Sequence, residues 1–389
     1  MKVIIVGAGV VGIQLAKRLI EEHHDVVLID KDPEAVKNTS HSIDCMVIQD
    51  KGNNLIVLKK AGIDKADFFI CVTGSDELNL VTCNMVSQSF SKPVTIARVR
   101  NEDYIYPMPI GMSHKYYNVD HIINPGKETS EAIIRSIESG VMRDITLFEG
   151  TRFEMTSLQV QKSSFFSGKA VKDLRQAFPW EFLIGVILRG DSYIIPSGDT
   201  VIEDKDTIYF IATRENLIEI FKIVGESNLI PRSVVIVGGG EIGSSVASFF
   251  LGKQKERQSF ILALMRLLPK GKRRAVTIVE KDYQKCKRLA ETFPDALILN
   301  ADISDEGFLE EQGFKEHDLI VTTTEKEDLN VITAMYAKSQ GFSKAVTLVM
   351  QLNYVNVAYR LGIDVAISLK NCVIGSILKL IRRGDVKNT

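Results

Sequence analysis

The feature that most constrains the fold of this chain is a glycine-rich motif that occurs twice. Residues 3–12 read VIIVGAGVVG and residues 234–243 read VVIVGGGEIG. In each motif an apolar strand runs into G-x-G-x-x-G and then into a helical pattern, which is typical of a dinucleotide-binding βαβ unit. Two such motifs in one chain, each followed by a matching pattern, predict a duplicated nucleotide-binding domain.

The two copies can be aligned along the sequence. Gly7 corresponds to Gly238, 231 positions later, whereas Gly62 and Gly313 are 251 positions apart. The difference between the two offsets indicates an insertion of 20 residues in the second copy, most of it around residues 252–274. The insertion contains an apolar run followed by lysines and arginines. It predicts either a helix folded onto its own domain or a contact with a membrane surface or partner.

Composition narrows the class of protein. The formal net charge is −1, so no broad basic field for nucleic acid is present. The N-terminus runs directly into a strand and lacks the pattern of a signal peptide, and no apolar run reaches the length of about 20 residues that a membrane helix needs. The five cysteines are scattered, which favours buried thiols over disulfides or a metal site. We expect a soluble cytoplasmic protein.

Strand and helix patterns alternate through residues 1–143 and again through 229–389. Several strands, such as residues 68–72, are continuously apolar, which indicates strands buried on both faces of a parallel sheet. Residues 144–228 instead hold short strands with turn signals and a closing helix. The sequence therefore predicts an α/β protein with two doubly wound parallel-sheet (Rossmann-like) domains and a small α+β subdomain between them.

The first motif carries the chemistry of a phosphate turn. Gly7, Gly9 and Gly12 let the turn close, let the backbone approach a phosphate and let the helix pack on the strand. Asp30 ends the second strand, where a carboxylate accepts hydrogen bonds from ribose hydroxyls, and Glu280 is its counterpart in the second copy. An acid here favours a free 2′-hydroxyl, so NAD(H), ATP, ADP and AMP all fit, whereas the 2′-phosphate of NADP would be repelled.

Catalytic groups are harder to find. None of the six histidines lies in a recognisable catalytic frame, and the sequence contains neither metal-ligand spacing nor a nucleophile elbow. We expect a protein with paired nucleotide-binding domains that is not an enzyme and has no metal site. The alternatives are an NAD-dependent oxidoreductase and a scaffold that keeps only the fold.

Longer stretches of the chain resemble a known family. Residues 58–79 (LKKAGIDKADFFICVTGSDELN) and 96–101 (IARVRN), together with the first motif and Asp30, resemble the TrkA regulatory subunits of bacterial Trk/Ktr potassium uptake systems, which are built from RCK (KTN) domains. Residues 164–174 and 195–210 are similar to the C-terminal subdomain of that family. The resemblance covers almost the whole chain.

The resemblance implies a cytoplasmic homo-oligomeric ring of RCK domains, peripheral at the inner face of the cell membrane beneath a membrane-embedded potassium channel subunit of the Trk/Ktr type. NAD(H), ATP or ADP would change the shape of the ring and gate the channel. It also implies the residues that bind the nucleotide. These are Gly7, Gly9, Val10, Val11, Gly12, Asp30, Lys31, Asp50, Thr73 and Arg98 in the first copy, and Gly238, Gly240, Glu241, Ile242, Gly243 and Glu280 in the second.

Within that set, Arg98 is implied to face the phosphates, with Arg100 as a second candidate, and Asp50 to line the adenine edge. The chain departs from the family pattern at three places. Residues 49–51 read Gln-Asp-Lys where the family commonly has Gly-Asp-Ala. An offset of 251 from Arg98 gives Val349, so we expect the second site to prefer a dinucleotide or to bind nothing. A second C-terminal subdomain, usual in tandem family members, is expected to be missing or cut off.

Overall fold

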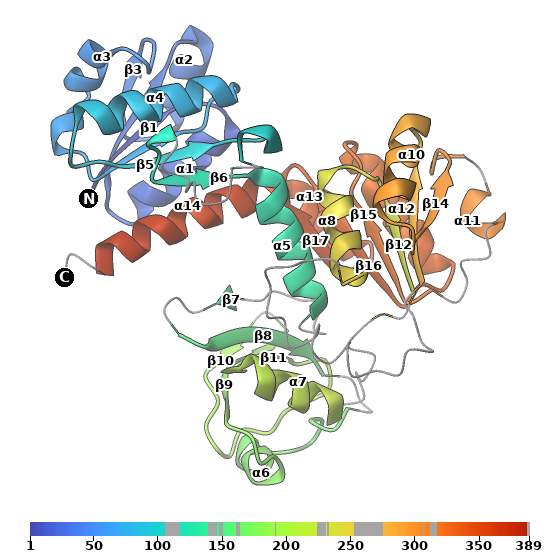
Figure 1. Cartoon of the computed structure of the whole chain (residues 1–389). Helices are drawn as coiled ribbons and strands as arrows, with labels where there is room; N and C mark the ends of the chain where they lie inside the picture. Colours follow the sequence, from blue (N-terminus) through green and yellow to red (C-terminus); the bar gives the residue numbers. More distant parts are fainter. Residues whose placement is uncertain are drawn as a thin grey trace. The chain divides into compact units, whose positions relative to one another are not determined.

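The computed structural model describes residues 1–105, 117–138, 146–147, 151–160, 164–190, 192–223, 231, 233–252, 275–305, 307–311 and 317–386. Two compact units can be distinguished, one formed by Met1–Thr129 with Ser368–Thr389 and one by Ser130–Ile367 (Figure 1). The predicted insertion lies, apart from Gly252, outside the described residues.

The first unit contains a six-stranded sheet with strand order β3-β2-β1-β4-β5-β6. Its strands are β1 (Lys2–Val6), β2 (Asp25–Asp30), β3 (Met46–Gln49), β4 (Phe68–Cys71), β5 (Val94–Arg98) and β6 (His121–Ile123). Every neighbouring pair is parallel. The strand order reverses between β1 and β4, so their carboxyl ends form the switch point where ligands bind in such sheets.

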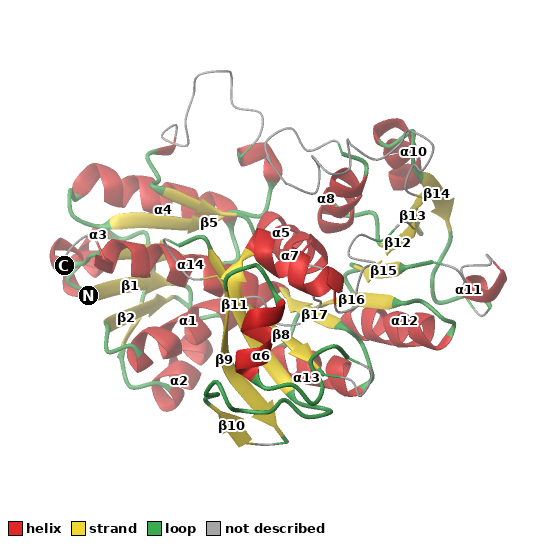
Figure 2. Ribbon diagram, turned by 90° about the horizontal axis from the view of Figure 1, so that it is seen from below, coloured by secondary structure: helices red, strands yellow, loops and turns green. Residues whose placement is uncertain are grey.

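Helices cover both faces of this sheet because the strands are apolar on both faces. The helices of the unit are α1 (Val10–Glu21), α2 (Pro33–Ser42), α3 (Leu55–Lys60), α4 (Asp76–Ser89) and α14 (Leu369–Val386). Helix α5 (Pro125–Glu138) begins in this unit, which ends at Thr129, and continues into the second. Val3 and Ile5 pack with α1 and α14 on one face, whereas Ile4 and Val6 pack with α3 and α4 on the other. Figure 2 shows α1 and α2 on the side of the sheet opposite α3 and α4.

Helix α14 is the last helix of the chain, yet it packs in the first unit. Val373, Ile374 and Ile377 are fully buried in the same core as Leu15 and Leu19 of α1. The sequence predicts this helix within a second domain over residues 229–389. The difference arises because the apolar stripe of α14 covers the face of the first sheet beside α1, a long-range contact that the sequence pattern does not reveal.

The second unit contains a sheet that repeats the first, with strand order β14-β13-β12-β15-β16-β17. Its strands are β12 (Ser233–Val237), β13 (Ala275–Glu280), β14 (Leu297–Asn300), β15 (Leu319–Thr322), β16 (Lys344–Val349) and β17 (Val365–Ser368). The helices that accompany them are α8 (Glu241–Phe250), α10 (Tyr283–Thr292), α11 (Phe308–Glu311), α12 (Glu327–Ser339) and α13 (Leu352–Arg360). Two such doubly wound sheets confirm the predicted fold class.

The α+β module lies between the two sheets in sequence. Its five-stranded sheet has the order β10-β9-β11-β8-β7, with β7 (Thr146–Leu147), β8 (Phe153–Gln159), β9 (Phe182–Arg189), β10 (Ser192–Ile194) and β11 (Thr207–Thr213), and with helices α6 (Val171–Ala177) and α7 (Arg214–Ile223). Each strand of this sheet runs antiparallel to its neighbours. Its core is rich in phenylalanine, and the buried Asp206 is paired with Arg189 at 2.8 Å.

The packing of α14 generates a prediction about stability. Ile377 is fully buried against the first sheet, so Ile377→Ala should lower the free energy of unfolding of the first unit by about 2–4 kcal/mol. Gly375 lies on the exposed side of the same helix, and a Cβ added there would meet no atom within 4 Å, so Gly375→Ala should raise stability by about 0.5–1 kcal/mol. Urea unfolding of both variants provides the measurement. Equal stability of the two would contradict the packing.

Candidate functional site

The first glycine turn joins β1 to α1 by a close approach of backbone to backbone. Gly7 has φ +112°, which disfavours any side chain. A Cβ at Gly12 would lie 1.9 Å from the carbonyl oxygen of Gly7, so only glycine allows α1 to pack this near β1. A Cβ at Gly9 would meet no atom within 4 Å. The turn is therefore closed on its protein side and open beside Gly9, at the first turn of α1.

Asp30 fixes the same turn from the end of β2. Its Oδ2 accepts a hydrogen bond from the backbone N–H of Ala8 at 2.6 Å, and its Oδ1 accepts one from the backbone N–H of Asp32 at 3.0 Å. Each carboxylate oxygen has a second lone pair. Asp30 can therefore hold the glycine turn in place and still accept hydrogen bonds from a diol.

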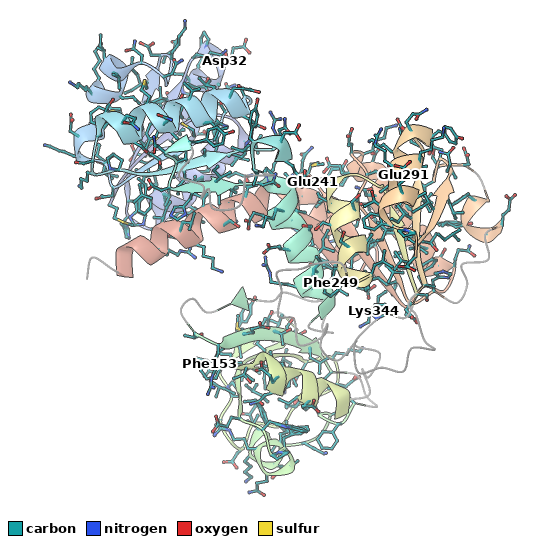
Figure 3. The ribbon with its side chains drawn as sticks, in the orientation of Figure 1. Asp32, Phe153, Glu241, Phe249, Glu291 and Lys344 are labelled. Carbon is teal, nitrogen blue, oxygen red and sulfur yellow. The ribbon has the colours of Figure 1, made fainter. Side chains whose placement is uncertain are left out.

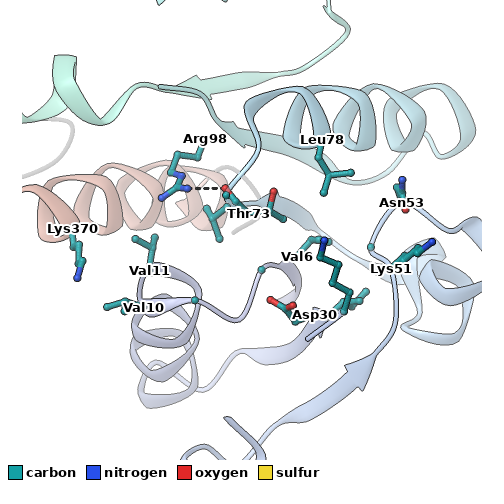
Figure 4. A pocket seen from close by; sticks show the side chains of 17 residues that line it. Val6, Val10, Val11, Asp30, Lys51, Asn53, Thr73, Leu78, Arg98 and Lys370 are labelled. Carbon is teal, nitrogen blue, oxygen red and sulfur yellow. Dashed lines mark hydrogen bonds between the residues drawn. The ribbon is translucent and has the colours of Figure 1, made fainter. Parts of the chain in front are cut away.

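A cavity of about 660 Å³ opens at the carboxyl ends of β1 and β4, between the glycine turn and the strands beside it (Figure 4). Its lining residues are Val6, Gly7, Gly9, Val10, Val11, Ile29, Asp30, Lys31, Lys51, Gly52, Asn53, Val72, Thr73, Gly74, Leu78, Arg98 and Lys370. The volume and the mostly apolar wall with a few polar groups suit a small organic ligand. The open side of the glycine turn supplies backbone N–H donors for an anion.

Arg98 supplies a positive charge to this cavity from the end of β5. Its Nη2 donates a hydrogen bond to the carbonyl oxygen of Thr73 at 2.7 Å, while its buried Nε has no hydrogen-bond partner among the described residues. Burial, and then the nearby charge of Arg100, lower the pKa of Arg98 below its usual value, and Asp76 opposes this shift. A partly desolvated guanidinium of this kind fits an anionic ligand.

Arg100, the second sequence candidate, does not line the cavity. Its Nε lies 3.4 Å from Oδ1 of Asp76, its backbone N–H donates to Oδ2 of the same carboxylate at 2.8 Å, and its Nη2 donates to the carbonyl of Gly74. Asp76 is buried, so Arg100 balances its charge. The Arg100 side chain therefore stabilises the connection that follows β4.

A buried asparagine joins β4 to β5 in the first copy and repeats in the second. Asn79 accepts hydrogen bonds from the backbone N–H and hydroxyl of Thr73 and donates to the carbonyl of Arg98 at 2.8 Å. Asn330 makes the same contacts with Thr324 and donates to the carbonyl of Leu348 at 3.0 Å. Leu348 is thus the counterpart of Arg98.

This register corrects the sequence alignment, which matched Arg98 to Val349. The strand pairing gives the same result, because Ala97 lies opposite Cys71 in the first sheet and Thr347 lies opposite Thr322 in the second. The stretch from Asn330 to Thr347 is one residue shorter than the stretch from Asn79 to Ala97. The counterpart of the arginine is still uncharged.

The second glycine turn has the same backbone as the first. Gly238 has φ +100°, and a Cβ at Gly243 would lie 2.0 Å from the carbonyl oxygen of Gly238. Glu280 repeats the contacts of Asp30, since its Oε2 accepts from the N–H of Gly239 and its Oε1 from that of Asp282, both at 2.9 Å. The glycine turn and the acid that fixes it are therefore present twice.

The charges differ between the copies. Glu241 begins α8 at the position that Val10 occupies in α1, and it lies at the helix N-terminus (Figure 3). A carboxylate in the first turn satisfies the positive end of a helix by itself and repels a phosphate. The second copy therefore has Leu348 where the first has Arg98, and Glu241 where the first has Val10.

The structure brings most of the predicted residues of the first copy together around one cavity: Gly7, Gly9, Val10, Val11, Asp30, Lys31, Thr73 and Arg98. Gly12 does not line the cavity, but it allows α1 to pack against the carbonyl of Gly7. Asp50 is exposed, accepts a hydrogen bond from the N–H of Lys51, and does not line the cavity. Its neighbours Lys51 and Asn53 do, and neither was singled out from the sequence. Lys370 was also missed, because it comes from the far end of the chain.

The described residues contain no cluster of three or more His, Cys, Asp or Glu side chains that could hold a metal ion. Within the same described ranges, every helix is too short or too polar to form a membrane span.

The fold and the paired glycine turns define a protein with two Rossmann-like lobes in tandem. Comparison with solved structures agrees. The chain is similar to the GsuK channel bound to NAD, with TM-score 0.63 at 16% identity over 99% of this chain and 64% of that one. It is also similar to the GsuK RCK domain, with TM-score 0.62 at 16% identity over 99% of this chain and 77% of the other. At this identity the likeness shows the fold alone.

Sequence comparison places the chain in a particular family. The TrkA-N domain model matches residues 3–125 and 258–369, and the TrkA-C domain model matches residues 155–225. The chain therefore belongs to the TrkA family. The second TrkA-N match begins at residue 258, although β12 and α8 precede that point and belong to the same lobe in the structure.

Relatives from several organisms resemble the whole chain. The Trk system potassium uptake protein TrkA of Haemophilus influenzae is 31% identical over all of this chain and 81% of the relative. The protein with the same name from Halomonas elongata is 30% identical over all of this chain and 80% of the relative. Membership of this family assigns the chain a regulatory role in potassium transport.

The last two glycines of the first turn, Gly9 and Gly12, give a matched pair of variants. Gly12→Ala should destabilise the first unit by about 2 kcal/mol or more, because its Cβ collides with the backbone of Gly7. Gly9→Ala should leave stability nearly unchanged, since Gly9 has φ −77° and open space beside it. Thermal unfolding followed by circular dichroism measures both. If Gly9→Ala were the more damaging change, the turn geometry given above would be wrong.

Proposed function

We propose that this protein is a nucleotide-sensing regulatory subunit of a potassium uptake channel or transporter. The observation that carries the proposal is the cavity of about 660 Å³ at the first glycine turn, with Asp30 at one end and Arg98 at the other. Family membership, which assigns a regulatory role in potassium transport, supports a potassium transport system as the target of the sensor.

The ligand proposed for the first cavity is an adenine nucleotide with a free 2′-hydroxyl, either NAD(H) or ATP/ADP. Asp30 accepts hydrogen bonds from the ribose, the glycine turn and the start of α1 hold the first phosphates, and Arg98 neutralises the phosphates further along. Solved structures of similar fold include GsuK bound to NAD and GsuK bound to ADP, which supports both ligand classes.

We propose that the protein acts by binding and not by catalysis. A ligand shifts an equilibrium between two arrangements only by its difference in affinity for them. The proposed partner is a membrane-embedded potassium channel subunit of the Trk/Ktr type, with the regulatory subunit as a cytoplasmic homo-oligomer peripheral at the inner face of the membrane. The alternative, an NAD-dependent oxidoreductase, requires a change in nicotinamide absorbance when candidate substrates are added with NAD(H).

Removing the ribose acid tests the nucleotide site. Asp30→Ala should weaken the binding of both NADH and ATP by about 1–3 kcal/mol, because hydrogen bonds to a charged group are lost. Asp50→Ala is the matched control, since Asp50 is exposed, lies outside the cavity and should leave affinity unchanged. Isothermal titration calorimetry of the three proteins measures the effect. Parent-like affinity of Asp30→Ala would disprove the assignment.

Ligand-dependent rearrangement is tested in solution. Small-angle scattering of the full chain should show an oligomer whose dimensions differ between the free, NADH-bound and ATP-bound states, because a useful switch needs a coupling of about 1–3 kcal/mol between nucleotide and assembly. A monomer with the same scattering profile in every ligand state would contradict the gating proposal while leaving nucleotide binding in place.

A further inference from the structure

We propose that Lys370 is a phosphate-contacting residue of the first cavity and that it determines the preference of that cavity for nucleotides with more than one phosphate. Lys370 lies in the first turn of α14, at the far end of the sequence from the glycine turn that it faces across the cavity. This inference rests on the proposed function and names a determinant of ligand choice within it.

The packing of α14 on α1 brings Lys370 to the cavity. The two helices run parallel, because Lys370 lines the cavity together with Val10 and Val11 at the start of α1, whereas Arg382 near the end of α14 bonds Glu22 just after the end of α1. Parallel helices place both amino ends at the same edge. The partial positive charges of two helix dipoles and the Lys370 ammonium therefore meet at this end of the cavity.

The position of the Lys370 ammonium is electrostatically unfavourable. A cation in the first turn of a helix opposes the helix dipole. Within the described part of the chain its ammonium makes no hydrogen bond or ion pair, although the side chain is partly buried. Arg98, which lies toward the same end of the cavity, also has a buried nitrogen without a hydrogen-bond partner among the described residues. An anion between the two cations would compensate both.

The positions of the charged residues divide the cavity into two ends. Figure 4 shows Lys370 and Arg98 on the side of Val11, and Asp30 with Lys51 toward the other side. A ribose bound at Asp30 directs its phosphate chain past the glycine turn toward Arg98 and Lys370. A monophosphate ends at the turn, whereas a diphosphate or triphosphate extends to the two cations.

Neither cation of the first cavity has a charged counterpart in the repeat. The strand register gives the counterparts, because Asp120 caps β5 by accepting from the N–H of Thr95, and Asp364 caps β16 by accepting from that of Ala345. Six residues after Asp364 is Lys370 in α14, and six residues after Asp120 is Gly126 in α5. Gly126 is therefore the counterpart of Lys370 in the first copy. Together with Leu348 in place of Arg98, this makes the recognition of a phosphate chain a property of the first copy.

The place of Lys370 in the sequence allows its contact with phosphate to have a regulatory effect. Helix α14 begins at Leu369, directly after β17 ends at Ser368, so the residue that contacts the phosphate follows closely on the edge strand of the second sheet. A phosphate chain that reaches Lys370 thereby contacts a helix that follows directly on the last strand of the second sheet. Such a contact can couple ligand identity to the arrangement of the two halves.

The test compares substitutions on one helix in the full chain. Lys370→Gln should weaken ATP binding by about tenfold, the value of a charge-assisted contact, and leave AMP binding unchanged. Lys370→Arg should retain most of the ATP affinity. Lys379→Gln is the matched control, since Lys379 lies on α14 but does not line the cavity, and it should bind ATP like the parent.

Calorimetric titration with ATP, ADP and AMP distinguishes the outcomes. A selective loss for ATP and ADP in Lys370→Gln, with circular dichroism and AMP affinity like the parent, supports the proposal. Parent-like ATP binding by Lys370→Gln, or equal losses for ATP and AMP, overturns it while the proposed nucleotide site stands. A parent chain that binds none of the three nucleotides and no NADH overturns the proposed function, and this inference with it.

Discussion

The close approach of α1 to the end of β1, which depends on glycine at positions 7 and 12, is the constraint on which the rest of the site depends. With any side chain at Gly12, the helix would have to move away from the carbonyl of Gly7 at the turn. The helix amino end would then leave the switch point of the sheet. Asp30 completes the arrangement, because it fixes the N–H of Ala8 from the neighbouring strand. The cavity is the space left open on the other side of this turn.

The same backbone constraint occurs in both copies, so it cannot explain a difference between them. The difference lies in charge. The first cavity has Arg98 and Lys370 near an uncharged helix start, whereas the second copy has Leu348 and a helix that begins with Glu241. The two copies share the geometry of the glycine turn but differ in the charged residues around it. We propose that the first copy binds a phosphate chain, with Lys370 supplied by the last helix of the second copy.

The sequence alone predicted much of this, because the relevant signals are local. Glycine spacing, the acid at the end of β2 and the continuous apolar strands each follow from short-range rules of backbone geometry and burial. The failures concern long-range contacts. The packing of α14 on α1 joins residues far apart in the chain, such as Arg382 and Glu22, which are separated by 360 positions. The apolar stripe of α14 indicated a need for a partner without identifying it, and Lys370 was missed for the same reason.

The register error at Arg98 has a similar physical origin. Sequence offsets are constant only within elements, and the stretch before Thr347, which is one residue shorter than its counterpart, shifted the match by one place. Only the hydrogen bonds of Asn79 and Asn330 and the strand pairing define the counterpart. Asp50 illustrates a different limit, since a residue in the expected stretch of chain can face solvent while its neighbours face the cavity.

The two copies share a fold, but we propose that only the first binds a phosphate-rich nucleotide. The most direct test is the stoichiometry of ATP binding to the purified full chain, measured by isothermal titration calorimetry. We expect one ATP per chain, with binding lost in a variant in which Asp30 and Arg98 of the first copy are both replaced by alanine. Two sites of equal affinity, or a single site that survives in that variant, would contradict it.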